Sequence, residues 1–365
     1  MLSDQYKQQL RTEVLKLDDL TDKKYDLDVL VKAVEDGITK SAPLELIKKL
    51  GDIRRTFGTK QMEEKEEQIV ELLYKYLGAA SVDEVYEMLR EQIDTPFEEL
   101  VRQLESLIGL SGVKSQVRDL IAFNELQRKR VELGLKKSNK TLHMAFLGNP
   151  GTAKTTVARI VGRMYKSLGI LSKGHFIEAG RADLIAEYQG QTAIKVRRLV
   201  NKARGGVLFI DEAYSITENE HSDSYGRECL TELTKALEDY RDDLVVIVAG
   251  YPNLMDQFFT SNPGLKSRFN AFITFPDYNE KELVDIFKYL CKQNDYLITE
   301  KGLLKLREKI QQDLEVGKSS ITSNGRYIRN IFDDVTMNQA KRLYGRKEAL
   351  DKHSLMLLCE LDFKN

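Results

Sequence analysis

The stretch from residue 143 to 156, HMAFLGNPGTAKTT, constrains the fold most, because an apolar strand leads through a glycine-containing loop into a helix. A turn of this kind directs backbone N–H groups and the positive end of the helix toward one anion. Lys154 can reach terminal phosphates, and Thr155 can ligate Mg²⁺. The pattern therefore predicts a site for nucleotide phosphates. The residues expected to form it are Asn149, Pro150, Gly151, Thr152, Ala153, Lys154, Thr155 and Thr156.

Position 153 departs from the usual phosphate loop, which has glycine where this chain has alanine. We expect a negative φ at Ala153, because the chain there is already turning into a helix, and alanine accepts such a conformation. Gly148 and Gly151 are expected to adopt conformations that only glycine accepts freely. The added methyl group can stiffen the loop or crowd the β-phosphate. It should therefore change affinity or rate only modestly.

A second motif, GVLFIDEA at residues 206 to 213, is an apolar strand that ends in two adjacent carboxylates. Carboxylates at the end of a buried strand are costly unless they have partners. We expect Asp211 to hold magnesium, directly or through water, and Glu212 to act as the general base that polarises the attacking water.

Beyond residue 140, short apolar runs alternate with helical segments, which predicts a parallel sheet in an α/β fold. Residues 1 to 105 show only amphipathic helical patterns, and from about residue 277 the chain is helical again. The predicted strands are HMAFLG, HFIEA, GVLFID, LVVIVAG and AFITF.

Three helix starts have the spacing of a capping box, in which a side chain at the helix start and another three residues later bond reciprocally to the backbone. They are Ser81 with Glu84, Thr95 with Glu98, and Asn279 with Glu282. In the second of these, Pro96 is expected at the first helical position.

Charge and composition limit the classes of partner. The 365 residues include 56 basic and 57 acidic side chains, so no overall field favours nucleic acid or an anionic membrane. The start, MLSDQYKQQL, has no apolar signal core, and the run LVVIVAGY is too short to span a bilayer. The three cysteines and four histidines are scattered, so neither structural zinc nor a disulfide framework is expected. We expect a cytoplasmic protein with no membrane partner.

The order of phosphate loop, LFIDEA, apolar strand, NPGLKSRF and NGRYIRN resembles that of an AAA+ ATPase. The finer motifs EYQGQT, GGVLFIDEAY, DDLVVIVAGYP and SNPGLKSRF resemble the branch that contains red-type rubisco activase (CbbX) and stage V sporulation protein K. The resemblance covers residues 105 to 345. It implies ATP and Mg²⁺ as ligands, and ATP hydrolysis. It does not cover the first hundred residues, whose helical pattern, together with the patterns of the rest of the chain, predicts three domains. These are an all-helical N-terminal domain (1–105), an AAA+ P-loop parallel-sheet domain (106–276) and a helical lid (277–365).

The resemblance also implies roles for single residues. Arg268 in GLKSRF matches the arginine finger, which reaches the nucleotide of a neighbouring subunit. Arg326 in SNGRYIRN matches the second sensor arginine, with Arg329 as the alternative. The first sensor corresponds to either Tyr251 or Asn253 in VAGYPNL.

Two further segments match the family. The segment LIGLSGVK resembles the one that wraps the adenine, so Leu107, Ile108 and Gly109 are expected to contact the base. Tyr188 in EYQGQT matches the aromatic residue of the pore loop. An aromatic side chain in such a loop can grip many sequences through undirected apolar contact.

The implied activity is remodelling of a protein client by a hexameric ring, of the chaperone or activase type, with the client or an adaptor binding through residues 1 to 105. The alternative is a nucleic-acid-associated loader or a nucleotide-controlled assembly switch. Only the basic stretch LQRKRVELGLKKSNK (126–140) argues for nucleic acid, and it lacks interleaved aromatic residues that could stack on bases. The protein client is therefore preferred.

Overall fold

The computed structural model describes residues 2–36, 42–57, 59–78, 95–136, 141–186, 188, 190–217, 224–317, 320–344 and 351–363. These residues belong to two compact units, residues 1–94 and 95–365, each with its own hydrophobic core. The predicted cap at Ser81 and Glu84 lies outside the described residues.

The first unit is helical, as predicted. In its first helix, Leu10, Val14 and Leu17 recur at helical spacing and are buried. Glu13 on the same helix bonds to Lys16 and to Lys65 of the fourth helix, and these bonds lower the pKa of the Glu13 carboxyl. The described helices are α1 (Leu2–Leu20), α2 (Leu27–Asp36), α3 (Ala42–Phe57) and α4 (Lys60–Leu77).

The second unit is built on a parallel sheet of five strands in the order β2-β3-β4-β1-β5. All five predicted strands form. In β3, Val207 and Phe209 face one core while Leu208 and Ile210 face the other, which explains why the run is apolar throughout. The strands are β1 (Met144–Gly148), β2 (Phe176–Ala179), β3 (Val207–Ile210), β4 (Val245–Gly250) and β5 (Ala271–Phe275).

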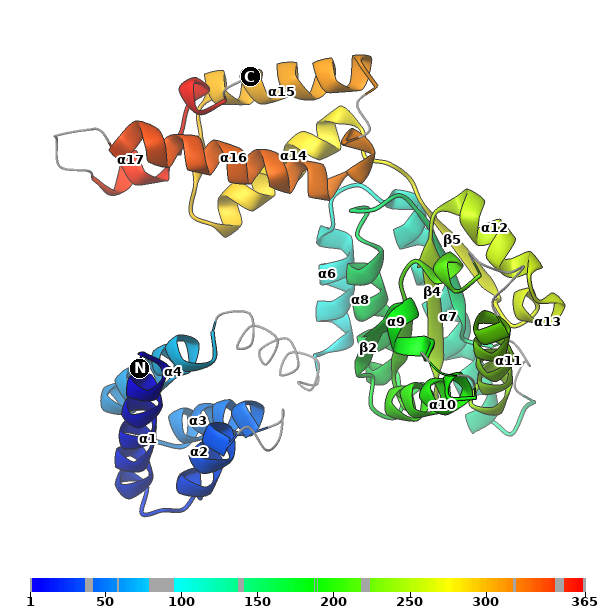
Figure 1. The fold of residues 1–365 in the computed structure, drawn as a ribbon, viewed down its shortest axis with the longest axis horizontal. Coiled ribbons are helices and arrows are strands. Elements are labelled where there is room, and N and C mark those ends of the chain that lie inside the picture. Colours follow the sequence, from blue (N-terminus) through cyan, green and yellow to red (C-terminus); the bar gives the residue numbers. More distant parts are fainter. Residues whose placement is uncertain are drawn as a thin grey trace. The chain divides into compact units, whose positions relative to one another are not determined.

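Helices cover both faces of this sheet (Figure 1). One face packs against α6 (Phe97–Ser106), α7 (Ser111–Glu132) and α8 (Lys154–Ser167). The other packs against α9 (Arg181–Leu184), α10 (Thr192–Ala203), the 3₁₀ turn η1 (Ala213–Ile216), α11 (Ser224–Asp239), α12 (Pro252–Thr260) and α13 (Pro263–Lys266).

The C-terminal part, residues 279–363, is called the lid below. Its helices α14, α15 and α16 lie together in Figure 1. Its described elements are α14 (Glu280–Gln293), β6 (Leu297–Ile298), α15 (Glu300–Glu315), η2 (Ile321–Ser323), α16 (Gly325–Tyr344), α17 (Lys352–Met356), β7 (Leu357–Leu358) and η3 (Glu360–Asp362).

Of the two predicted caps that can be compared, one is confirmed. Asn279 and Glu282 bond reciprocally at the start of α14, at 3.0 Å and 2.9 Å. At the other, the predicted helix start is wrong. Pro96 is extended (ψ 143°) and itself precedes Phe97, the first residue of α6, so the helix begins one residue later than predicted.

No helix within the described ranges is long and apolar enough to cross a membrane. The same ranges contain no group of three or more His, Cys, Asp or Glu side chains arranged to hold a metal ion. The three cysteines, which all lie within the described residues, form no disulfide.

His143, immediately before β1, is fully buried and links two neighbouring elements. Its Nδ1 accepts a hydrogen bond of 3.0 Å from the backbone N–H of Val246, and its Nε2 lies 2.8 Å from the carbonyl oxygen of Leu237. The ring is therefore neutral with the proton on Nε2. Burial lowers the pKa of His143 from 6.5 to about 4.

This pKa predicts a pH-dependent loss of stability. Between pH 6.5 and 4 the unfolded chain gains a proton at residue 143 that the folded chain excludes, so this residue disfavours folding progressively as the pH falls, by about 3 kcal/mol at pH 4. His143→Gln keeps a donor toward Leu237 but cannot titrate. Urea denaturation should therefore show the variant less stable at pH 7, with the gap to the wild type closing by about 3 kcal/mol at pH 4. A gap that does not change with pH would contradict the buried neutral ring.

Candidate nucleotide-binding site

The phosphate loop between β1 and α8 turns through two left-handed residues, Gly151 (φ +71°) and Ala153 (φ +68°). Gly151 was predicted correctly. The negative φ predicted for Ala153 is wrong, because the chain is still in the turn at residue 153 and becomes helical only at Lys154. Alanine accepts this conformation at a cost, since its Cβ crowds the following carbonyl oxygen.

Gly148 is required for a different reason from the one predicted. Its φ is not positive, but a Cβ on it would lie 2.5 Å from the carbonyl oxygen of Phe275 in β5. Glycine thus allows the end of β1 to pair closely with β5, which sets the point where the loop leaves the sheet.

Lys154 is held within the loop. Its Nζ donates hydrogen bonds to the carbonyl oxygens of Gly148 (2.9 Å) and Asn149 (2.8 Å), and only 9 % of the residue is exposed. Burial lowers the pKa of Lys154, and the Asp211 carboxylate opposes that shift. A cation kept this far from water has a strong tendency to pair with an anion.

The two carboxylates follow β3, as predicted. Asp211 Oδ1 accepts a hydrogen bond of 3.0 Å from the backbone N–H of Glu212. Glu212 has a left-handed backbone (φ +48°, ψ 44°), which is uncommon for a residue with a side chain and directs that side chain out of the strand direction. Strain of this kind is found most often at functional sites.

These groups open into a cavity of about 530 Å³, within the range of roughly 300–1,000 Å³ usual for small-molecule sites. Its polar end carries the loop, both carboxylates and two arginines of α16. Its apolar end is formed by Leu107, Ile108, Tyr278, Ile286, Tyr289 and Leu290. A polyanion fits the first end and a flat aromatic base fits the second, so the residues present suit a nucleoside triphosphate.

Most of the predicted residues line this cavity. They are Leu107, Ile108, Pro150, Gly151, Ala153, Lys154, Thr155, Thr156, Asp211, Glu212, Tyr251 and Arg326, together with the alternative Arg329. Of the two first-sensor candidates, Tyr251 lines the cavity, whereas Asn253 is an exposed residue of α12 outside it.

The other predicted residues lie outside the lining. Asn149 and Thr152 belong to the loop but bond within the protein, Asn149 to Asp277 and Thr152 to the carbonyl oxygen of Asn149. Gly109 packs against Glu282, whose Oε1 would lie 2.2 Å from a Cβ at that position. Tyr188 is 66 % exposed.

Arg268 also lies outside the cavity of its own chain. Its Nε is 3.1 Å from Glu238 Oε2, but the N–H is not aligned for a hydrogen bond. Glu238 also pairs with Arg241 at 2.7 Å. The side chain of Arg268 is 35 % exposed, although its Nε is buried, so this Nε is held within the subunit by an ion pair and not by an aligned hydrogen bond.

Sequence reasoning missed the part of the cavity contributed by the lid and its connection to the sheet. Tyr278 and the α14 residues Ile286, Tyr289 and Leu290 line the cavity together with Leu107. Burial raises the pKa of Tyr278 to about 12, so its ring is neutral. No sequence signal pointed to these residues, because the α14 segment has the pattern of an ordinary amphipathic helix.

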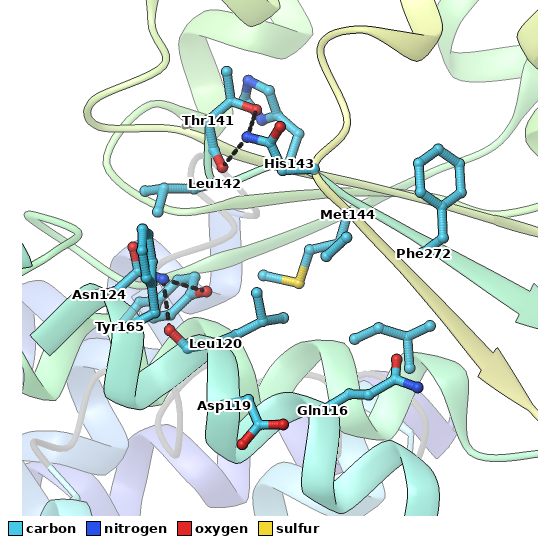
Figure 2. A pocket seen from close by; sticks show the side chains of 14 residues that line it. Gln116, Asp119, Leu120, Asn124, Thr141, Leu142, His143, Met144, Tyr165 and Phe272 are labelled. Carbon is cyan, nitrogen blue, oxygen red and sulfur yellow. Dashed lines mark hydrogen bonds between the residues drawn. The ribbon is translucent and has the colours of Figure 1, made fainter. Parts of the chain in front are cut away.

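A second cavity, of about 410 Å³, lies at the opposite end of β1 and β5 (Figure 2). It is lined mainly by α7 and by residues 141–144 and 270–273. Asn124 of α7 bonds across it to the hydroxyl of Tyr165 at 3.2 Å. It contains none of the predicted site residues and no cluster of charges.

The parallel sheet, the phosphate loop and the paired carboxylates define a P-loop nucleotide-binding protein. Two family models extend over most of the second unit: "ATPase family associated with various cellular activities (AAA)" over residues 144–277 and "AAA lid domain" over residues 279–365. The chain belongs to the AAA ATPase family, and it is an ATPase.

Curated relatives agree with this assignment. The chain is 41 % identical to stage V sporulation protein K of Bacillus subtilis, over 67 % of this chain and 76 % of the relative. It is 41 % identical to CbbX of Cereibacter sphaeroides, over 73 % and 85 %. It is also 41 % identical to the chloroplastic ribulose bisphosphate carboxylase/oxygenase activase of Cyanidioschyzon merolae, over 71 % and 86 %.

Among solved structures, the AAA domain of FIGL-1 in complex with ADP matches with a TM-score of 0.50 and 21 % identity. The match covers 71 % of this chain and 80 % of that one. It supports the AAA fold.

The left-handed conformation of Ala153 predicts that glycine is the better residue there. Ala153→Gly should raise the stability of the protein by up to about 1 kcal/mol, or roughly 2–4 °C in melting temperature, because relief of the Cβ strain exceeds the added entropy of the unfolded chain. Thermal denaturation without nucleotide measures this.

The matched control is Ala340→Gly, on an exposed position inside α16. The same chemical change there should destabilise by about 1 kcal/mol, because glycine is a poor helix former. If both substitutions destabilised alike, residue 153 would not be strained.

Proposed function

We propose that this chain is an Mg²⁺-dependent ATPase that works as a homo-oligomeric ring, with six subunits as the expected number, and uses ATP hydrolysis to remodel a protein client. The observation that carries the proposal is the distribution of charge around one cavity. Lys154, Asp211, Glu212 and Arg326 border it, whereas Arg268 lies outside it.

The residues divide the chemistry between them. Thr155 and Asp211 would hold Mg²⁺, which supplies charge neutralisation at the terminal phosphates. The loop N–H groups, Lys154 and Arg326 bind and orient the phosphates. Glu212, the most exposed of the acidic pair, acts as the base that orients and deprotonates the attacking water.

Arg268 supplies the argument for an assembly. The cavity has Lys154 and Arg326 of its own subunit, and an additional arginine finger from a neighbour, directed at the charge developing on the transferred phosphoryl group, raises such rates by about 10³–10⁵. Arg268 is loosely paired and partly exposed, and so is available to the cavity of a neighbouring subunit. The ring thereby couples hydrolysis to contact between subunits.

A protein client is supported by Tyr188 and by the relatives. The 66 % exposure of Tyr188 is unusual for an aromatic side chain and suits apolar contact with a passing polypeptide. One relative is named as an activase of another enzyme. We propose that the client or an adaptor binds through the helical N-terminal domain, residues 1 to 105. These residues precede both family models, and most of them precede the compact unit that contains the site.

Nucleic acid is not favoured as the partner. On the described part of the basic stretch, Lys129 pairs with Glu125 at 3.0 Å and Arg128 with Glu132 at 3.7 Å. These pairs leave less positive charge to neutralise phosphates, which supply most of the affinity for nucleic acids.

Mixing two inactive variants tests the action of Arg268 across subunits. An Arg268→Ala subunit has an intact nucleotide site but no arginine for its neighbour. A Lys154→Ala subunit has Arg268 for its neighbour but an inactive nucleotide site. Each alone should hydrolyse ATP at least about 10³-fold more slowly than wild type, and an equimolar mixture should regain part of the activity. Steady-state phosphate release is the measurement.

The control mixture pairs Arg268→Ala with the double variant Lys154→Ala/Arg268→Ala, which brings no finger, and it should stay inactive. If the first mixture also stayed inactive while the variants co-assembled, Arg268 would not act between subunits.

Tyr188→Ala tests the pore contact. It should leave basal ATP hydrolysis within about twofold of wild type, because the side chain is exposed and outside the cavity. Stimulation of hydrolysis by an unfolded polypeptide such as casein should be lost. Tyr188→Phe keeps the aromatic ring and should retain stimulation. Equal stimulation of the Ala and Phe variants would exclude an aromatic grip.

A further inference from the structure

Three polar side chains connect the phosphate loop to the lid through the segment between β5 and α14. Asn149 of the loop donates from Nδ2 to both carboxylate oxygens of Asp277, at 2.9 Å each. Asn324, immediately before α16, donates to Asp277 Oδ1 at 2.7 Å. Its own Oδ1 accepts from the backbone N–H of Tyr278 at 2.8 Å. Asp277 therefore bonds to the loop and the lid at once.

Asn324 is buried, with 1 % exposed, and its backbone is strained (φ 53°, ψ −118°). Such a conformation is costly for a residue with a side chain and persists where the surroundings over-determine it. The Nδ2 group also approaches the carbonyl oxygens of Thr322 (2.9 Å) and Pro150 (3.4 Å). The side-chain bonds thus hold the backbone in a shape that glycine would adopt more easily.

The backbones of loop and lid also touch beside these side chains. The N–H of Gly325 donates to the carbonyl oxygen of Gly151 at 3.1 Å. A Cβ on Gly151 would lie 2.1 Å from the carbonyl oxygen of Ser323 and 2.9 Å from the backbone nitrogen of Arg326. The first turn of α16, which carries Arg326, therefore rests directly on the phosphate loop.

We propose that Asn149, Asp277 and Asn324 form a clasp that fixes the start of α16 against the phosphate loop, so that Arg326 and the loop bind phosphate as one unit. The inference rests on the proposed function of this cavity. The three are positioning residues, since they act on phosphate through the loop and Arg326. When the clasp is intact, a displacement of the loop by phosphate is passed to the lid through Asp277.

The expected effect is on coupling. Each bond to the Asp277 carboxylate is charge-assisted. If losing one such bond weakens the arrangement that binds phosphate, we expect affinity to fall by roughly tenfold. Without the clasp, Arg326 is no longer fixed against the loop. Substitution of Arg326 should then lower nucleotide affinity less than it does in the wild-type protein. This non-additivity distinguishes a clasp from residues that only support the fold.

The experiment measures binding of a fluorescent ADP analogue to the full chain by anisotropy, together with the melting temperature without nucleotide. Asn324→Gly relieves the backbone strain but removes all the side-chain bonds, so it should fold at least as well as Asn324→Ala and yet bind about tenfold more weakly than wild type. Asp277→Asn and Asn149→Ala should weaken binding similarly. Arg326→Ala should weaken wild type strongly and the Asn324→Gly protein little.

Asn338→Ala is the matched control, because it removes an amide of α16 that bonds to the carbonyl oxygen of Asp362 at 3.0 Å, away from the cavity. It should leave affinity unchanged. Wild-type affinity in Asn324→Gly and Asp277→Asn, with an undiminished effect of Arg326→Ala, would overturn the clasp while leaving the proposed function intact. Failure of the wild-type protein to bind the analogue would instead reject the proposed function.

Discussion

The close contact at Gly151 is the constraint on which the rest of the site depends. No side chain fits there, because the end of η2 and the first turn of α16 lie within van der Waals distance of the loop. Residue 151 must therefore be glycine for the start of α16 to lie this close to the loop. The lid that makes this contact also contributes Ile286, Tyr289 and Leu290 of α14 to the lining of the same cavity as Leu107 and Ile108. The position of the lid thus affects both the polar and the apolar lining of the cavity.

Three residues with side chains adopt unfavourable backbone conformations around this contact. Ala153 and Glu212 are left-handed, and Asn324 lies in a region still less suited to a side chain. Each such residue costs of order 1–3 kcal/mol. Ala153 immediately precedes α8, and Glu212 lies just after β3. Asn324 lies directly before α16, at the point where the lid contacts the loop. Other residues with side chains, such as Asp22 and Asp295, are also left-handed, but at Ala153, Glu212 and Asn324 the conformation sets the direction of groups in the site.

The sheet and the chemical end of the site could be predicted because their signals are local. Short apolar runs identified all five strands, although only β3 and β4 are buried throughout and the edge strands β2 and β5 are partly exposed. The loop and the paired carboxylates directly follow β1 and β3. The sign of φ at Ala153 was predicted wrongly because the helix, with its negative φ values, begins only at Lys154. Asp277, Asn324 and Tyr289 could not be predicted, since each is an ordinary polar or amphipathic position in sequence and becomes part of the site only through contacts across 47 residues or more.

The loose pairing of Arg268 with Glu238 fits an arginine that must change partners. An exposed ion pair of this kind is worth about 0–1 kcal/mol, and a guanidinium bonded to a phosphate gains a stronger, charge-assisted interaction. Arg342, by contrast, makes two bonds, at 2.7 Å and 2.9 Å, to the fully buried Asp362, and hydrogen bonding to Asp362 raises the pKa of Arg342. Arg342 is thus a fixed support in the lid, whereas the proposed role of Arg268 requires its ion pair with Glu238 to separate. The difference follows from burial, because only a buried partner makes separation of the charges expensive.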